Sequence, residues 1–418
     1  MSEHQPATIN DSDIRVPDGH AWNKLPAILG GVGLIGLAAS FVLRGEHPEQ
    51  FSFSYLVAFL YFLSIALGGL FFILINFASK AGWSISVRRV AENVMATLPL
   101  FVLLAVPLFL GFEHLYHHWL HASVEDVVVQ GKKAWLNKSF FSVRTMVYVV
   151  IWALLGLFYY SRSVKQDQSG EPKLTEAMQN MSYPGIAIFA ITTSFAAFDW
   201  IMSMDPHWYS TIYGVYFFAG CLIGIFATMI LLTLLAKQSG LLKQAVNLEH
   251  FHDLGKLLFA FTVFWAYIAF SQFMLYWYGN IPEETAFFAK RWYVVHHEGT
   301  ALINTFQTSS WATISVILGV GHFVVPFFFL MPRTIKRKPA FLAFGAIWML
   351  AMHLVDIYWL VMPENPHMHG FHLTLLDLTT WVGVGGLFLG AFFWVARRQA
   401  LVPLKDPRLP ESLRFENF

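Results

Sequence analysis

The sequence has little charge and only one cysteine. Of its 418 residues, 13% are charged, against roughly 25% in an average soluble domain. A single cysteine, Cys221, can form neither an intrachain disulfide, nor the CxxCH motif of a haem c attachment, nor an iron–sulfur site, so we predict no covalently bound cofactor. The formal net charge of +1 gives no reason to expect a nucleic acid or a strongly acidic partner.

The apolar content is high, and it is arranged in long runs. Hydrophobic residues make up 56% of the chain, with 41 Phe and 15 Trp. A bilayer core needs about 20 consecutive apolar residues, and lipid leaves the backbone of an open chain no conformation but a helix. The sequence therefore predicts an all-α integral membrane protein in a lipid bilayer. We place ten transmembrane helices at 25–43, 53–77, 89–110, 140–160, 183–204, 210–236, 254–278, 307–330, 339–361 and 375–396.

The basic residues predict the orientation of these spans. Residues 1–24 form a polar N-terminal segment without the basic start of a cleaved signal, 25–396 form the membrane domain, and 397–418 form a C-terminal tail. Twenty of the 27 Lys and Arg residues fall in segments on the side of the termini. Because cytoplasmic loops are enriched in Lys and Arg, we expect both termini in the cytoplasm.

Asp199 is the most unusual residue of the predicted spans. It lies in the otherwise apolar span 183–204, about five residues from the outer end. A charge at membrane depth is costly and is retained where it pairs, binds a ligand or transfers protons. Asp199 is therefore the first candidate functional residue.

Other polar groups are predicted in the same outer half of the membrane. They are Arg144, Gln272, His353, Asp356 and Asp377. One hypothesis is a quinol-binding or proton-release site, in which a carboxylate or histidine accepts a hydroxyl proton and aromatic residues such as Trp277 hold the ring. The alternative is that Arg144 pairs with an aspartate and only stabilises helix packing.

Two further candidates lie in the inner half and could belong to an inner half-channel for protons. Glu92 follows Arg88 and Arg89 at helical spacing, so a pair at the interface is an equal alternative. His322 could equally be a buried core histidine. A haem shared by His322 and His353 is disfavoured, because their predicted depths differ by about 10 Å at 1.5 Å per residue.

A histidine-rich segment, Glu113–His121, lies in the first long outer loop. On a helix its four histidines would share one face, which could bind a metal. We favour an interfacial helix whose Tyr116 and Trp119 lie in the aromatic belt, and so predict no metal site. The histidines are His114, His117, His118 and His121.

Three segments make the chain resemble a known family. They are Glu113–His121 (EHLYHHWLH), Phe198–Tyr213 (FDWIMSMDPHWYSTIY) and His252–Glu284 (HDLGKLLFAFTVFWAYIAFSQFMLYWYGNIPEE). The family is the NrfD/polysulfide-reductase membrane subunits, and the chain is most similar to those of bacterial alternative complex III. The resemblance implies two four-helix bundles, spans two to five and six to nine, with spans one and ten outside them.

The resemblance also implies a function and partners. The function is that of a membrane subunit of a quinol:cytochrome c, or other acceptor, oxidoreductase in the bacterial inner membrane, using menaquinol or ubiquinol. The partners are a multihaem cytochrome c subunit and an iron–sulfur protein, which carry the redox centres, a homologous membrane subunit and small membrane anchors. In such complexes the homologous subunit is the better candidate for quinol oxidation, and this type is more often assigned proton conduction or a scaffold role.

Two alternatives remain from the sequence, a stand-alone proton-coupled transporter and a purely structural anchor. Transporters often have paired interrupted spans. The sequence predicts no such pair, although Pro99 and Pro107 predict a kink in span three.

Overall fold

The computed structural model describes residues 10–298, 301–368 and 370–417. Within these residues ten helical segments are long and apolar enough to cross a membrane, in the places that the sequence predicts. The spans are α2 (Leu25–Leu43), α3 (Pro48–Ala78), α4 to α6 (Ile85–Met95, Leu98–Leu104 and Val106–Leu110), α10 (Lys138–Ser169), α11 (Pro172–Trp200), α12 (Tyr213–Gln238), α13 (Leu248–Gly279), α15–η3–α16 (Ser310–Ile317, Leu318–Val324 and Val325–Leu330), α18 (Pro339–Val361) and α19 (Leu375–Ala396).

Short elements connect the spans, and they include a β-hairpin that was not predicted from the sequence. The strands β1 and β2 form an antiparallel hairpin. β2 reaches into the segment predicted as span eight, which begins at Ser310 instead of 307. The short elements are α1 (Asp11–Ile14), η1 (Ala21–Asn23), α7 (Phe112–Leu115), α8 (His117–Leu120), α9 (Val127–Gly131), η2 (Met202–Met204), α14 (Pro282–Lys290), β1 (Tyr293–Glu298), β2 (Ala301–Thr308), α17 (Arg333–Lys336), η4 (Met362–Glu364) and α20 (Leu409–Leu413).

Several spans are longer than predicted because their polar ends continue the helix beyond the apolar run. The clearest case is the connection of α10 to α11, where only Gly170 and Glu171 separate two long helices. Gly170 has φ +69°, a left-handed helix end that glycine adopts without strain. Pro172 then occupies the first position of α11, where its missing N–H is not needed.

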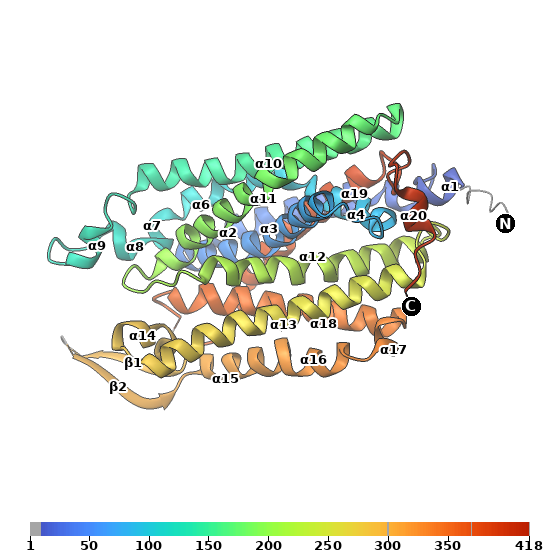
Figure 1. Ribbon diagram of the computed structural model, residues 1–418. Helices are drawn as coiled ribbons and strands as arrows, with labels where there is room; N and C mark the ends of the chain where they lie inside the picture. The colour runs from blue at the N-terminus through green and yellow to red at the C-terminus, as the bar shows by residue number, and fades with distance from the viewer. Residues whose placement is uncertain (1–9, 299–300, 369, 418) are drawn as a thin grey trace.

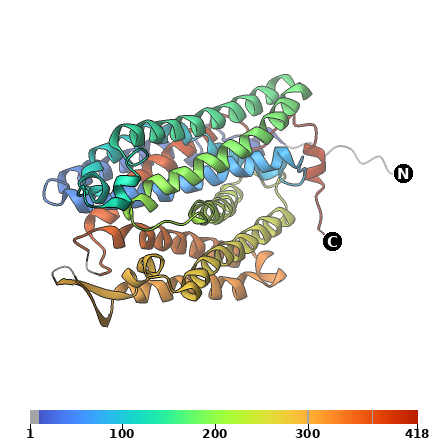
Figure 2. The same ribbon diagram turned by 60° about the vertical axis from the view of Figure 1, so that its left-hand side comes forward.

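Two long helices form the centre of the molecule. α3 packs against α4, α11, α19 and α12, and α12 packs against α11, α13 and α18. Figures 1 and 2 show α10 and α11 on one side of this centre and α13, α15 and α16 on the other. Helices α1 and α20 lie at the same end of the molecule, whereas α8, α9, α14 and the hairpin lie at the opposite end (Figure 1).

Spans one and ten, α2 and α19, pack on each other through glycines. A Cβ on Gly33 would lie 2.6 Å from the Leu387 backbone N, and one on Gly386 would lie 2.6 Å from the Gly33 backbone N. Contacts this short need residues without side chains, as is common between membrane helices. Gly33 and Gly386 therefore allow the close approach of α2 and α19.

Spans three and eight are not continuous α-helices. Span three is broken into α4, α5 and α6, and span eight contains a π-helical segment, η3, between two α-helical pieces. Spans three and eight are thus both interrupted, but they are the second span of one predicted bundle and the third span of the other. Prolines lie in both spans, Pro99 and Pro107 in span three and Pro326 in the first turn of α16 in span eight, but a kink was predicted only for span three.

Candidate functional site

Asp199 forms a saturated ion pair with Arg144. The Arg144 guanidinium, on α10, donates to both carboxylate oxygens from Nε and Nη2, each at 2.8 Å. The Trp135 indole N–H donates to Oδ1 at 2.9 Å and the Tyr148 hydroxyl to Oδ2 at 2.8 Å. Asp199 is 0% exposed. Both oxygens are thus occupied by donors of the protein, as the helix-packing alternative expects for Arg144.

Glu92 is paired as well, as its pairing alternative expects, and it is 0% exposed. Arg88 Nε lies 3.0 Å from one carboxylate oxygen and Arg89 Nε 2.9 Å from the other, to which the Ser163 hydroxyl also donates. Arg88 in turn pairs with Asp406 of the C-terminal tail at 2.7 Å. The tail therefore covers this group at the inner end of span three.

The two membrane-depth histidines lie in different surroundings. His353 Nε2 lies 2.7 Å from the Ser64 hydroxyl oxygen, and a Cβ on Gly220 of α12 would lie 2.7 Å from the His353 ring. A haem bound to His353 would need the space beside the ring that the α12 backbone and the Ser64 hydroxyl occupy. His322, in η3, is 0% exposed and packs on Trp265 with ring centroids 3.9 Å apart.

Asp377 caps a helix. Its carboxylate accepts from the Thr374 backbone N–H at 2.8 Å, and the Thr374 side chain accepts from the Asp377 N–H, which is a capping box at the start of α19. The hydroxyl of Ser54 donates to Oδ1 at 2.6 Å, and Gln50 also donates to Oδ1. These contacts account for a carboxylate at this position without a ligand.

Asp356 has only neutral partners. The Tyr216 hydroxyl donates to Oδ1, and the Trp265 indole N–H donates to Oδ2 at 3.1 Å. The carboxyl group is 1% exposed, and no Lys or Arg of the described part of the chain forms a salt bridge with it. Burying a carboxylate without a cation is costly, so such groups mark ligand or proton sites.

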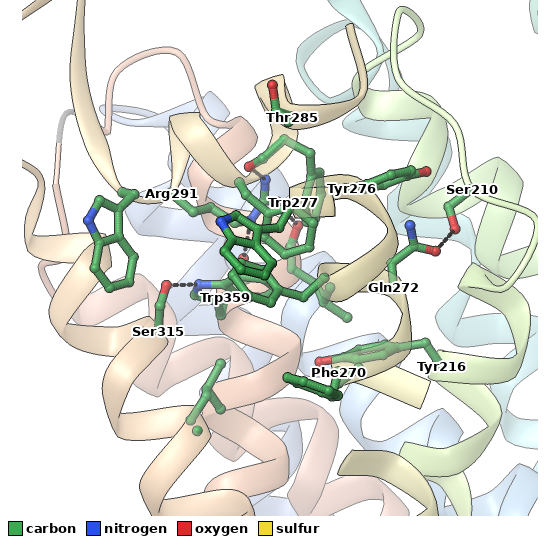
Figure 3. Close-up of a pocket in the computed structure, with 18 of the residues that line it drawn as sticks. Ser210, Tyr216, Phe270, Gln272, Tyr276, Trp277, Thr285, Arg291, Ser315 and Trp359 are labelled. Carbon is green, nitrogen blue, oxygen red and sulfur yellow. Dashed lines mark hydrogen bonds between the residues drawn. The ribbon is translucent and has the colours of Figure 1, made fainter. Parts of the chain in front are cut away.

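A cavity of about 810 Å³ lies between α12, α13, α14, span eight and α18, next to Asp356 (Figure 3). Its walls are mainly aromatic, with a few polar pairs: the Ser210 hydroxyl donates to Gln272 Oε1 at 2.5 Å, and the Trp359 indole N–H donates to Ser315 at 2.8 Å. Its volume and lining are typical of a site for a small apolar ligand with a few polar groups. Six of its aromatic residues are Tyr216, Trp265, Phe270, Phe273, Trp277 and Trp359.

The cavity and Asp356 share two residues. Tyr216 and Trp265 line the cavity, and the same two side chains donate to the Asp356 carboxylate behind the wall. A hydroxyl group in the cavity can therefore reach the carboxyl group through the Tyr216 hydroxyl. Of the predicted ligand surroundings, Gln272 and Trp277 line the cavity, whereas Arg144 does not and is held by Asp199.

Two ion pairs beside the cavity join Lys290 and Arg291 to Glu364. Arg291 lies over the Phe287 ring at 3.5 Å and donates to Glu364 at 3.0 Å, and Lys290 pairs with the other Glu364 oxygen at 2.6 Å. Arg291 and Phe287 both line the cavity. Because the Arg291 side chain also donates to backbone carbonyls of α18, it holds α14 against α18 instead of facing a ligand as a free charge.

The histidine-rich segment does not form one helix. Tyr116 separates α7 from α8, and its hydroxyl donates to the Trp200 carbonyl. Tyr116 and Trp119 are buried in the core, so the prediction that they lie in the aromatic belt is wrong. Packing against neighbouring aromatic side chains stabilises them more than a place at the membrane interface would. Burial, with the nearby Lys290 charge, lowers the pKa of His118. Among the described residues, no set of His, Cys, Asp and Glu side chains is arranged to hold a metal ion.

The predicted polar residues do not form a single cluster. No hydrogen bond in the described part of the chain joins Asp199 to His353, Asp356 or Asp377, each of which has partners of its own. Sequence reasoning missed Tyr216 and Trp265, because nothing distinguishes them from the other Tyr and Trp residues of the spans. Tyr216 has one signal, its position in the first turn of α12, and Trp265, near the middle of α13, has none.

Comparison with protein-family models finds no match for this chain, and neither does comparison with curated proteins.

Proposed function

We propose that the chain is the integral membrane subunit of a quinol:cytochrome c, or other acceptor, oxidoreductase complex, and that it binds quinol in the aromatic cavity. The observation that carries the proposal is the pairing of Asp356 with Tyr216. The Asp356 carboxyl group is buried and forms no salt bridge among the described residues. Only the Tyr216 hydroxyl separates it from a cavity whose size and lining suit a quinol ring. Asp199 and Glu92, by contrast, are each neutralised by arginine.

The chemistry that this arrangement supports is proton acceptance. Oxidation of one quinol releases two protons and two electrons. A ring hydroxyl placed against Tyr216 passes the first proton to the phenol oxygen as the phenol passes its own to Asp356, and the second proton follows the same route after Asp356 has released the first to water. The electrons leave to the iron–sulfur and haem c centres of partner subunits, because the single Cys221 cannot hold such centres in this chain.

The helix packing supports the proposed architecture. The contacts α3–α4, α5–α10, α10–α11 and α11–α3 close one ring of four spans, and α12–α13, α13–α16, η3–α18 and α18–α12 close another. We propose that these are two four-helix bundles with α2 and α19 outside them. Helix α1, near the N-terminus, and helix α20, near the C-terminus, both lie where Lys and Arg are frequent. We therefore also propose cytoplasmic termini in a bacterial inner membrane.

Two experiments test the proposal. Affinity purification of the chain from native membranes should bring down a multihaem cytochrome c subunit, an iron–sulfur protein and a second membrane subunit; a cofactor-free homo-oligomer would contradict it. A photoreactive quinone should label cavity residues of α13 such as Phe270 or Trp277 in that complex. Labelling confined to the helices around Asp199 would place the quinol site elsewhere.

One observation favours a second candidate, a proton-coupled transporter. Spans three and eight are both interrupted, and transporters often bind their substrate at broken helices. Reconstitution of the purified chain alone decides between the two: uptake of a solute driven by a proton gradient would favour transport, and loss of all activity without partners favours the oxidoreductase subunit.

A further inference from the structure

Basic residues gather on the short helix α17 and the residues after it, which join span eight to α18. Four of the six residues 333–338 are Lys or Arg. Figure 1 shows α17 at the end of the molecule at which α20 lies. Helix α13 packs on α17 and adds one more cation. The five residues, called the basic cluster below, are Lys256, Arg333, Lys336, Arg337 and Lys338.

Carboxylates of the chain balance only two members of the basic cluster. Arg337 donates from Nη1 to Glu249 Oε2 at 2.9 Å, and Lys256 Nζ lies 2.5 Å from Asp253 Oδ1. The other three members form no salt bridge with any described residue, and the side chains of Arg333 and Lys338 form no hydrogen bond either. Three positive charges of the cluster are therefore left without a carboxylate of the described residues.

Lys336 carries one of these charges at a buried position. It is 6% exposed, and its Nζ donates to the carbonyls of Leu330 at 2.6 Å and Met331 at 2.7 Å. A Cβ on Gly255 of α13 would lie 3.1 Å from the Lys336 Cγ, so α13 fixes the side chain. Burial, together with the nearby Lys256 charge, lowers the pKa of the ammonium group. A buried cation beside other cations is costly unless an anion binds next to it.

We propose that the basic cluster binds the head group of an anionic phospholipid in the leaflet at this end of the molecule. The Arg333 guanidinium and the ammonium groups of Lys336 and Lys338 hold its phosphate. Clusters of Lys and Arg next to the end of a membrane helix are typical sites for anionic head groups. Binding of a lipid here does not depend on the proposed quinol site.

The neighbouring side chains favour a phospholipid over a free phosphate ion. Phe328 of α16 and Phe341 and Phe344 of α18 are exposed residues of membrane-spanning segments. The Lys338 Nζ lies 5.6 Å from the centroid of the Phe341 ring, so the basic cluster directly adjoins this apolar surface. Acyl chains that cover these rings add apolar burial that a free phosphate ion cannot provide.

The test is native mass spectrometry of the purified full-length protein in detergent. It is titrated with phosphatidylglycerol and with phosphatidylcholine of the same acyl chains, and the dissociation constants are compared. The double variant Arg333→Gln with Lys338→Gln removes the two cations without a partner. Lys165→Gln with Lys173→Gln is the matched control, because these two lysines of α10 and α11 are also exposed.

Each Lys or Arg near an anionic surface contributes about fivefold to the binding constant. We therefore expect the unaltered protein to bind phosphatidylglycerol about tenfold or more tightly than phosphatidylcholine. The Arg333 and Lys338 double variant should lose this preference, and the control double variant should keep it.

Three results would overturn the proposal. Equal affinity of the unaltered protein for the two lipids means that no anionic head group is recognised. An equal loss of preference in both double variants means that the charge of the whole end attracts lipid and that the basic cluster is not a site. Displacement of phosphatidylglycerol by an excess of inorganic phosphate means that a free phosphate ion is the ligand. Arg333→Gln alone, with an expected loss of about fivefold, covers a double variant that fails to fold.

Discussion

Replacing Arg144 by methionine should destabilise the protein strongly, because the change leaves the Asp199 charge buried. The carboxylate is 0% exposed and accepts from four donor groups, two of which belong to Arg144. After the change only the Trp135 and Tyr148 donors remain. Breaking one partner out of a buried ion pair costs about 3–5 kcal/mol, so we expect a loss of that size in the free energy of unfolding.

The assay is denaturant unfolding in detergent micelles, followed by tryptophan fluorescence. The decisive comparison is the double variant Arg144→Met with Asp199→Leu, since replacing a whole buried pair by apolar side chains is often neutral. It should recover most of the loss. The exposed pair of Arg15 with Asp11, at 2.9 Å, supplies the control: Arg15→Met should change stability by less than about 1 kcal/mol.

Two outcomes would refute this reasoning. If Arg144→Met is as stable as the unaltered protein, water or lipid head groups reach Asp199 and the site is not closed. If the double variant is no more stable than the single one, the loss comes from the packing of the Arg144 side chain on Trp135 and Phe140 and not from the unpaired charge.

The remaining predictions concern packing, the tail and an outer loop. Gly386→Leu should push α2 away from α19, because its Cβ would lie 2.6 Å from the Gly33 N; proteolysis of α2 should become faster, at a cost of about 1–3 kcal/mol. Asp406→Asn should weaken the hold of the tail on Arg88, seen as faster hydrogen exchange in residues 401–417. At Asp126 the N–H of α9 lowers the pKa of the carboxyl group, so its stabilisation is present above the ordinary value of 3.8 and is lost as the pH falls through the lowered one. Exchange in α9 should rise over that range, and Asp126→Ala should abolish the dependence.

The spans could be predicted because a helix that crosses lipid needs a long apolar run. The residues at which the helices begin and end could not be predicted in this way. The apolar run of α11 begins at Tyr183, but its helix begins at Pro172, where polar residues with good helix propensity continue the turn. The hairpin could not be predicted either, because a short segment of strand-forming residues beside a span has no apolar run that marks it.

The candidate residues were recognised because an ionisable side chain in an apolar span costs free energy. Their roles depend on contacts between helices, which the spacing of residues in the sequence does not reveal. Asp199 and Asp356 look alike in the sequence as single carboxylates in apolar spans. Only the structure shows that Arg144 neutralises one and that Tyr216 and Trp265 leave the other without a cation. Long-range partners from other helices therefore decide which of two similar residues is the better candidate.

The most direct test of the central claim is quinol turnover with proton release in the Asp356→Asn variant of the intact complex. The matched variant is Asp377→Asn, a carboxylate that also lacks a cation but caps α19 away from the cavity. Loss of a positioned proton acceptor costs 10²- to 10⁴-fold in rate. We expect a fall of about that size in kcat for Asp356→Asn, and near-normal turnover for Asp377→Asn. Equal turnover in the two variants would contradict the assignment of Asp356 as the proton acceptor.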